Sequence, residues 1–226
     1  MIVAAAVCPH PPLLFRELTG QRDVAAGLRT SCLAVIGSAT AGPVDRVVVV
    51  GGADTGRGWD PALEPQIRRF TTTGPEAPGL PLSLGVGKRL LAEAGWREAV
   101  DLVSVAWDAS ATEVETLAGV VDALPGRAAL LVLGDGSARR GDKAPGYVDE
   151  RAFGYDAATA RALADGDPAG LLAQDAGLAT ELMAGGRAAL AVLAGVAGTR
   201  PRTPQAELVY QDDPYGVMYF AACWRL

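Results

Sequence analysis

Two stretches of this 226-residue chain, residues 2–7 and 128–133, are apolar without any alternation. A third segment, residues 44–50, ends in four consecutive valines, Val47–Val50, before two glycines. A strand with one face in water alternates polar and apolar residues, so these runs predict strands that are buried on both faces. Strands of this kind lie in the middle of a largely parallel sheet that is covered by helices on both sides.

The segments between these runs show helical patterns and turn signals. Helices are expected over residues 22–38, 83–95, 110–124, 156–165, 168–184 and 187–197, further strands over 101–106, 206–210 and 217–224, and long connections over 71–82 and 134–155. Ser110 followed by Glu113 is a capping-box pattern for a helix N-terminus. The last two strands and their turn at 212–214 are typical of an antiparallel hairpin. We therefore expect a single α/β domain over residues 1–226, with three layers and a mostly parallel mixed sheet flanked by helices.

Composition and charge exclude several classes of protein. The formal net charge of −6 comes without a clustered basic face, so we expect no nucleic-acid partner. The longest small-apolar run, residues 188–198, is too short for a bilayer, so we expect no membrane partner. Cys8, Cys32 and Cys223 are far apart and form no CxxC pair, which favours a reducing cytoplasm over a disulfide-bonded compartment.

Polar residues follow the predicted strands at the points where the strands end. His10, the only histidine, follows the first strand, Asp54 follows Gly51-Gly52, and Asp135 follows the strand at 128–133. Ligands of open α/β sheets bind beyond the carboxyl ends of the strands, so His10, Asp54 and Asp135 are the candidate catalytic residues of one crevice. Each also has a structural alternative: His10 could bond a main-chain carbonyl, and either aspartate could be a turn or N-cap residue. We expect Cys8 to be a small, buried apolar residue rather than a nucleophile.

Four short motifs, in order along nearly the whole chain, resemble one known family. They are CPHPPLL at 8–14 after the first strand, GGAD at 51–54, GDGSA at 134–138 and GVMY at 216–219. The chain resembles the class III extradiol dioxygenases of the LigB type and the related Memo-like proteins. The resemblance implies an α/β fold built around a site at the ends of the strands.

The same resemblance implies a non-haem Fe(II) that is held by two histidines and a carboxylate, with a further histidine as acid/base. His10 matches the first iron ligand. The second ligand falls near Ala53, beside Asp54, and the acid/base histidine falls at Ala138. Alanine has neither a lone pair nor an exchangeable proton, so ring cleavage as the family performs it is not expected here.

The carboxylate ligand that the resemblance implies would lie toward the C-terminus, where Glu207, Asp212 and Asp213 remain open as alternatives. The sequence does not identify a cofactor. His10 with Asp54 and one of these carboxylates could still bind Fe(II) or another divalent metal through a site rich in oxygen ligands.

Three functions stay open at this point. The first is a LigB-like protein that has lost the iron site and binds a small molecule or a partner in the crevice where the family holds its iron. The second is an enzyme that uses crevice carboxylates for hydrolysis or proton transfer, with or without a metal. The third is a noncatalytic subunit of a larger complex, and true dioxygenase activity ranks below these. Four tryptophans and an apolar C-terminal strand leave room for a homodimer.

Overall fold

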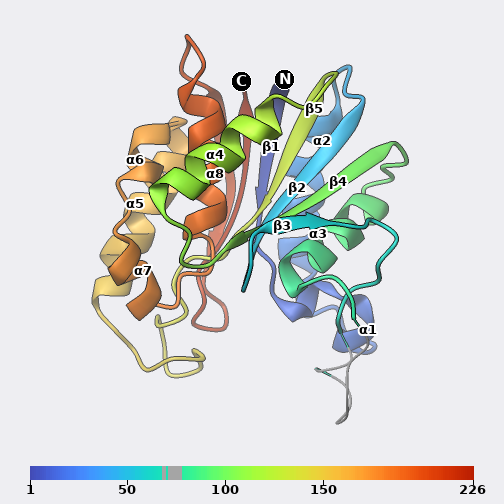
Figure 1. The fold of residues 1–226 in the computed structure, drawn as a ribbon. Helices are drawn as coiled ribbons and strands as arrows, with labels where there is room; N and C mark the ends of the chain where they lie inside the picture. Colours follow the sequence, from blue (N-terminus) through green and yellow to red (C-terminus); the bar gives the residue numbers. More distant parts are fainter. Residues whose placement is uncertain (68–69, 71–77) are drawn as a thin grey trace.

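A computed structural model describes residues 1–67, 70 and 78–226 of the chain. Its strands form one sheet in the order β3-β4-β2-β5-β1-β7-β6 (Figure 1). The strands are β1 Ile2–Cys8, β2 Arg46–Ala53, β3 Arg57–Trp59, β4 Ala99–Ala106, β5 Ala128–Leu133, β6 Gln205–Asp212 and β7 Tyr219–Arg225. The central strands β4, β2, β5 and β1 are parallel, whereas β3, β7 and β6 pair with their neighbours in the antiparallel direction. The predicted mixed α/β sheet with a C-terminal hairpin is confirmed.

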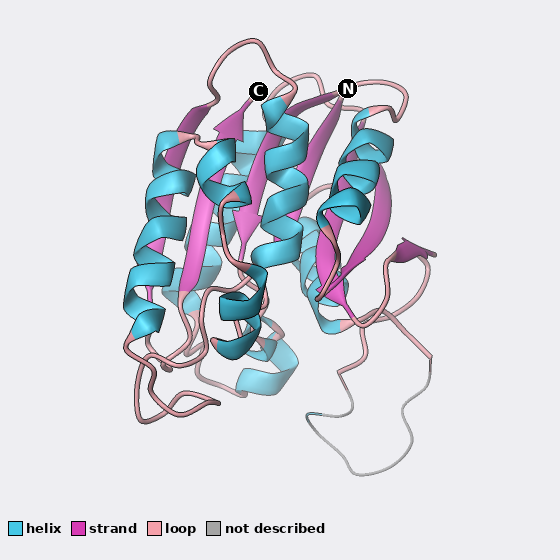
Figure 2. Ribbon diagram, turned by 60° about the vertical axis from the view of Figure 1, so that its left-hand side comes forward, coloured by secondary structure: helices cyan, strands magenta, loops and turns pink. Residues whose placement is uncertain are grey.

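Helices cover both faces of this sheet (Figure 2). One face carries α4 Ala111–Asp122, α5 Arg151–Asp165, α6 Pro168–Leu172 and α8 Arg187–Gly198, and the other carries α2 Ala26–Thr40 and α3 Leu82–Glu93. The short helices α1 Arg16–Thr19 and α7 Ala176–Glu181 lie toward the carboxyl ends of the parallel strands (Figure 1). The short helix η1 Pro12–Leu14 precedes α1 in the chain. The expected three layers are therefore present. Within the described residues, none of the helices combines the length and the apolar character needed to span a bilayer.

The central strands contribute side chains to both layers of the core. On β2, Val48 and Val50 belong to the buried cluster that includes α8 and α4, whereas Val47 and Val49 belong to the cluster that includes α2 and α3. All six residues of β5 are buried. This two-sided burial is the reason why these segments show no polar alternation in the sequence.

Two predicted helices differ from the observed ones. The helix expected over 168–184 is two helices, α6 and α7, because the Asp175 carboxylate accepts the Leu178 N–H at 2.6 Å and begins a new helix. The helix expected from 156 begins at Arg151, whose N–H donates to the Asp149 side chain at 3.0 Å. The first difference comes from the N-cap Asp175 inside a segment with a continuous helical pattern, and the second comes from a helix that starts within the predicted connection.

The sheet edge carries a strand that the sequence did not predict. Strand β3 has only three residues and pairs with β4 at Arg57↔Ser104. A segment this short has no recognisable period, and its glycine weakens the strand signal. Most of the loop expected over 71–82, namely residues 71–77, lies outside the described residues.

A buried ionic network holds the long connection after β5. The Asp156 carboxylate, which is fully buried on α5, accepts hydrogen bonds from the Ser137 N–H at 2.9 Å and the Ser137 hydroxyl at 2.5 Å. Arg140 donates to Asp156 at 3.2 Å and to Asp213 at 2.6 Å. Burial raises the pKa of Asp156 despite these opposing contacts. The network fixes the segment that carries Asp135.

Candidate functional site

The parallel strands bring the predicted site residues to one end of the sheet. Cys8 at the end of β1 is in register with Leu133 at the end of β5, and Gly51 of β2 is in register with the same leucine. The residues that follow these strands therefore meet. The structure places His10 against Asp135 and places Asp54 in the same pocket as His10.

Asp135 holds His10 through both its backbone and its ring. Its Oδ1 accepts the His10 main-chain N–H at 2.8 Å and lies 3.5 Å from the ring Nδ1. The His10 side chain is only 8% exposed, and its Nδ1 is buried without a hydrogen-bond partner. No hydrogen bond joins the ring to a main-chain carbonyl within the described part of the chain. Because Nδ1 faces Asp135, Nε2 is the ring nitrogen that remains for a ligand.

Burial raises the pKa of Asp135 above its usual value, and the nearby His10 opposes this effect without cancelling it. A buried carboxyl next to an imidazole is an arrangement that can hold a proton and pass it on. The pair is therefore the chemically most versatile feature of this end of the sheet.

Trp107 connects the two halves of the site. Its ring stacks on His10, with centroids 6.2 Å apart and an interplanar angle of 19°. Its indole N–H donates to Asp54 Oδ1 at 3.3 Å, and its main-chain N–H donates to the Ala53 carbonyl at 3.1 Å. Trp107 is not among the site residues predicted from the sequence. Its position directly after β4, at the same end of the sheet, was the signal that could have found it.

A pocket of about 250 Å³ opens between these residues. The residues that line it are His10, Gly52, Ala53, Asp54, Thr55, Trp59, Gln66, Pro81, Leu82 and Trp107. Drug-sized ligands need about 300–1,000 Å³, so this pocket suits a smaller molecule. Its lining combines two tryptophans with the polar side chains of His10, Asp54, Thr55 and Gln66.

The C-terminal carboxylates do not line this pocket. Glu207 of β6 lies opposite Cys223 of β7 in the sheet and lines a separate pocket of about 220 Å³. Asp212 accepts the Asp213 N–H at 2.9 Å, and Asp213 is bound by Arg140. These aspartates therefore shape and anchor the hairpin turn.

The residues present do not fit an iron site made of two histidines and a carboxylate. His10 is the only imidazole, and Ala53 occupies the pocket position where the second ligand would stand. Ala138 is buried and donates its main-chain N–H to the Leu182 carbonyl. No three His, Cys, Asp or Glu side chains are grouped to hold a metal ion among the residues that the structure describes.

The three cysteines are free and buried. Cys8 lies 3.9 Å from the Cys32 carbonyl oxygen, measured from its Sγ. Burial, followed by the contact with Cys32, raises the pKa of Cys8 well above its usual value. A fully buried thiol that resists ionisation is a poor nucleophile, so Cys8 acts as a core residue.

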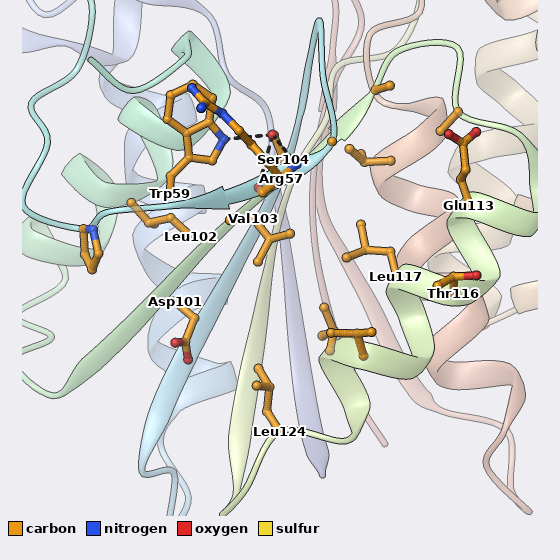
Figure 3. A pocket seen from close by; sticks show the side chains of 18 of the residues that line it. Arg57, Trp59, Asp101, Leu102, Val103, Ser104, Glu113, Thr116, Leu117 and Leu124 are labelled. Carbon is orange, nitrogen blue, oxygen red and sulfur yellow. Dashed lines mark hydrogen bonds between the residues drawn. The ribbon is translucent and has the colours of Figure 1, made fainter. Parts of the chain in front are cut away.

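A larger cavity of about 720 Å³ lies between β4, β3 and α4, with valine and leucine side chains on its walls (Figure 3). Its charged side chains are already engaged. Arg57 stacks over the Trp59 ring at 3.7 Å, Asp101 accepts from Arg46 at 3.0 Å, and Glu113 closes the capping box of α4. The groups suited to chemistry therefore lie in the smaller pocket beside His10.

Fold and site together define a three-layer α/β protein with a small pocket at the carboxyl ends of its parallel strands. No family model matches the chain, and none of the curated proteins matches it either. Among solved structures, it is similar to an uncharacterized protein, JW3007 from Escherichia coli K12. The two are 14% identical with a TM-score of 0.53, over 99% of this chain and 100% of the other. This similarity shows a shared fold.

Proposed function

We propose that the chain is a divergent LigB-like protein that binds a small molecule in the pocket beside His10, without the iron-dependent ring cleavage of that family. The observation that carries this proposal is a nine-tenths buried histidine at the wall of a small pocket, with its Nδ1 on the side of Asp135. Because Asp135 fixes the backbone of His10 and faces Nδ1, the Nε2 of the same ring is left to serve a ligand or a reaction. The motifs at 8–14, 51–54 and 134–138 lie at the carboxyl ends of strands β1, β2 and β5, at the same end of the sheet, which supports the resemblance to the LigB type.

A second candidate is an enzyme that uses this pocket for proton transfer or hydrolysis. The contact between Asp135 and His10 favours it, because a carboxylate that orients an imidazole leaves the far nitrogen free to take or give a proton. In this reaction Asp135 positions the ring, and His10 Nε2 exchanges the proton with the bound molecule. Trp107 would hold the ring plane from the other side.

The single histidine gives a direct test of binding. Its imidazole signals in a ¹H–¹⁵N spectrum need no assignment, because the chain has no other histidine. A panel of small aromatic acids, alcohols, amines and amides is titrated into the full chain, with His10→Ala as the second protein. We expect at least one saturable shift of the His10 ring that is accompanied by a shift of the Trp107 indole. A panel that perturbs other residues but never His10 would contradict the proposal.

The two candidates differ in what Asp135→Asn does. If the pocket only binds, Asp135→Asn keeps the acceptor for the His10 N–H and the ligand affinity stays within about twofold. If the pocket catalyses, the same variant loses turnover of the bound compound while it still binds. Turnover is measured by following each binding compound for chemical change over hours.

We also propose a cytoplasmic location, because three free cysteines with no disulfide suit a reducing compartment. A homodimer or a partner subunit stays a proposal as well. Sedimentation of the purified chain across a hundredfold range of concentration tests the homodimer, and copurification tests the partner.

A further inference from the structure

Among the described residues that line it, the pocket beside His10 has an aspartate and no basic side chain. Asp54 is the one lining residue with a full charge in the described structure, and no lysine or arginine is among those lining residues. Asp54 is exposed and its Oδ1 accepts the Trp107 indole N–H. Its Oδ2 accepts no hydrogen bond from the described residues, so this oxygen is available to a ligand.

Two indole rings line the same pocket. Trp107 is 42% exposed although it is stacked on a buried histidine, and Trp59 lies on a neighbouring wall. The face of an indole ring is electron-rich and attracts cations that lie within about 6 Å of its centre. One face of Trp59 already carries such a cation, because the Arg57 guanidinium lies 3.7 Å above it. Trp107 has no comparable partner in the described structure.

In the described part of the chain, two arginines contact these tryptophans without lining the pocket. Arg57 is stacked on Trp59 from the side of β3, and Arg187 donates to the main-chain oxygens of Trp107 and Ala109 at 3.4 and 2.9 Å. Neither is a lining residue. Among the described residues, an anionic ligand would therefore meet Asp54 with no cation on the lining, whereas a cationic ligand would gain both Asp54 and the indole face.

We infer that the pocket takes a small organic cation, whose ammonium group lies against Trp107 with Asp54 as its counter-ion. This inference rests on the proposed function, because it assigns a ligand class to the same pocket. The volume of about 250 Å³ limits the ligand to a compact molecule such as an alkylammonium or a choline-like compound. His10 Nε2 then contacts the polar end of the ligand, where it can accept a hydroxyl or N–H proton.

A pair of isosteric probes tests the charge directly. Choline and 3,3-dimethylbutan-1-ol have the same shape, but only choline carries a positive charge. Both are titrated into the full chain at constant ionic strength, and the Trp107 indole and the His10 ring are followed by NMR. We expect a saturable shift with choline and an affinity for the neutral alcohol that is at least tenfold weaker.

Two variants with matched controls locate the site. Asp54→Asn removes the counter-ion and is expected to weaken choline binding at least fivefold. The control Asp108→Asn, which changes an exposed carboxylate next in sequence to Trp107 but outside the lining, is expected to leave the affinity unchanged. Trp107→Leu is expected to abolish binding. Trp96→Phe, which changes a tryptophan just after the C-terminal end of α3 and outside the lining, is expected to leave binding unchanged.

The outcomes separate this inference from the proposed function. Equal binding of the alcohol and choline, or an unchanged affinity in Asp54→Asn, overturns the cation assignment and leaves small-molecule binding standing. If acetate shifts the His10 ring signals more strongly than choline does, the cation assignment is also overturned and small-molecule binding still stands. If choline leaves His10 and Trp107 unperturbed while another compound of the panel shifts them, the cation assignment fails alone. If no compound of any charge shifts them, both fail.

Discussion

The indole ring of Trp107 occupies the space in which a side chain at position 52 would stand. A Cβ added to Gly52 would lie 1.8 Å from Trp107 Cζ3, closer than any two unbonded atoms can approach. Gly52 lies on β2, and Trp107 follows β4, the strand that is paired with β2. The glycine therefore permits the stacking of Trp107 on His10, and with it the shape of the pocket.

Gly52→Ala is expected to displace the Trp107 ring from His10. The indole is 42% exposed and can move outward, so we expect a stability loss of about 1 kcal/mol rather than unfolding. The indole and His10 ring signals should both shift, and binding at the pocket should weaken at least tenfold. Gly58→Ala is the control, because a Cβ there meets nothing within 4 Å. Unchanged Trp107 signals in Gly52→Ala would show that the ring does not need this space.

Asp135 is expected to respond differently to two substitutions. Asp135→Ala leaves the buried His10 N–H without its acceptor, which costs about 1–3 kcal/mol. Asp135→Asn keeps an oxygen at this place and removes a buried charge, so its stability at pH 7 should equal or exceed that of the wild type. Urea unfolding of the three proteins checks the order. Equal losses in both variants would mean that the carboxylate charge, rather than the acceptor, holds His10.

The raised pKa of Asp135 predicts how the stability of the protein changes with pH. The pKa of Asp135 is raised in the folded protein, so the folded state binds its proton more tightly than the unfolded chain does. Its contribution to stability is full below the unfolded value of about 3.9 and is lost as the pH rises through the raised folded value. The stability of Asp135→Asn relative to the wild type should therefore grow as the pH rises from about 4. A difference that shrinks over this range contradicts the raised pKa.

The sequence predicted the parts of this protein that depend on burial and on local capping. The unbroken apolar runs at 2–7 and 128–133 identified two-sided strands, because only a covered sheet tolerates them. Ser110 and Glu113 identified the start of α4, because both partners of the capping box are local.

Features that depend on distant contacts escaped prediction. The position of Trp107 after β4 places it at this end of the sheet, but its stacking on His10, 97 positions away in the chain, depends on side-chain placement. The unpartnered Nδ1 of His10 and the raised pKa of Asp135 depend on side-chain placement, which no motif encodes. The motifs at 8–14 and 51–54 contain lining residues of the pocket, and the motif at 134–138 contains Asp135, which contacts His10 without lining the pocket. The full lining and its charge required the folded structure.

The Asp156 network is expected to be a major source of stability for the segment that carries Asp135. Asp156→Ala leaves the buried Ser137 N–H and hydroxyl unpaired and Arg140 with only Asp213, so we expect a loss of about 3 kcal/mol. Ser137→Ala removes one hydrogen bond and should cost about 1 kcal/mol. Asp142→Asn, on an exposed part of the same segment, is the control. Urea midpoints measure all three, and a loss below 1 kcal/mol for Asp156→Ala would show that the network contributes little.

Asp122 joins the end of α4 to the start of β1 and should make stability fall in acid. Its Oδ1 accepts the Ile2 N–H at 2.9 Å, and Arg200 donates to both of its oxygens. Burial raises its pKa, but the hydrogen bonds from Arg200 and Ile2 outweigh burial and leave the pKa below its usual value. The folded state therefore binds this proton less tightly than the unfolded chain does.

The contribution of Asp122 is present above about pH 4 and is lost as the pH falls through its lowered value. Asp122→Asn should cost about 2 kcal/mol at pH 7 and progressively less below pH 4, where the wild-type carboxylate also becomes protonated. The control Asp165→Asn changes an exposed carboxylate on α5 and should show no such convergence. Unfolding is measured in urea from pH 3 to pH 7. If the difference between the wild type and Asp122→Asn stays constant over this range, the charge on Asp122 is not what joins α4 to β1.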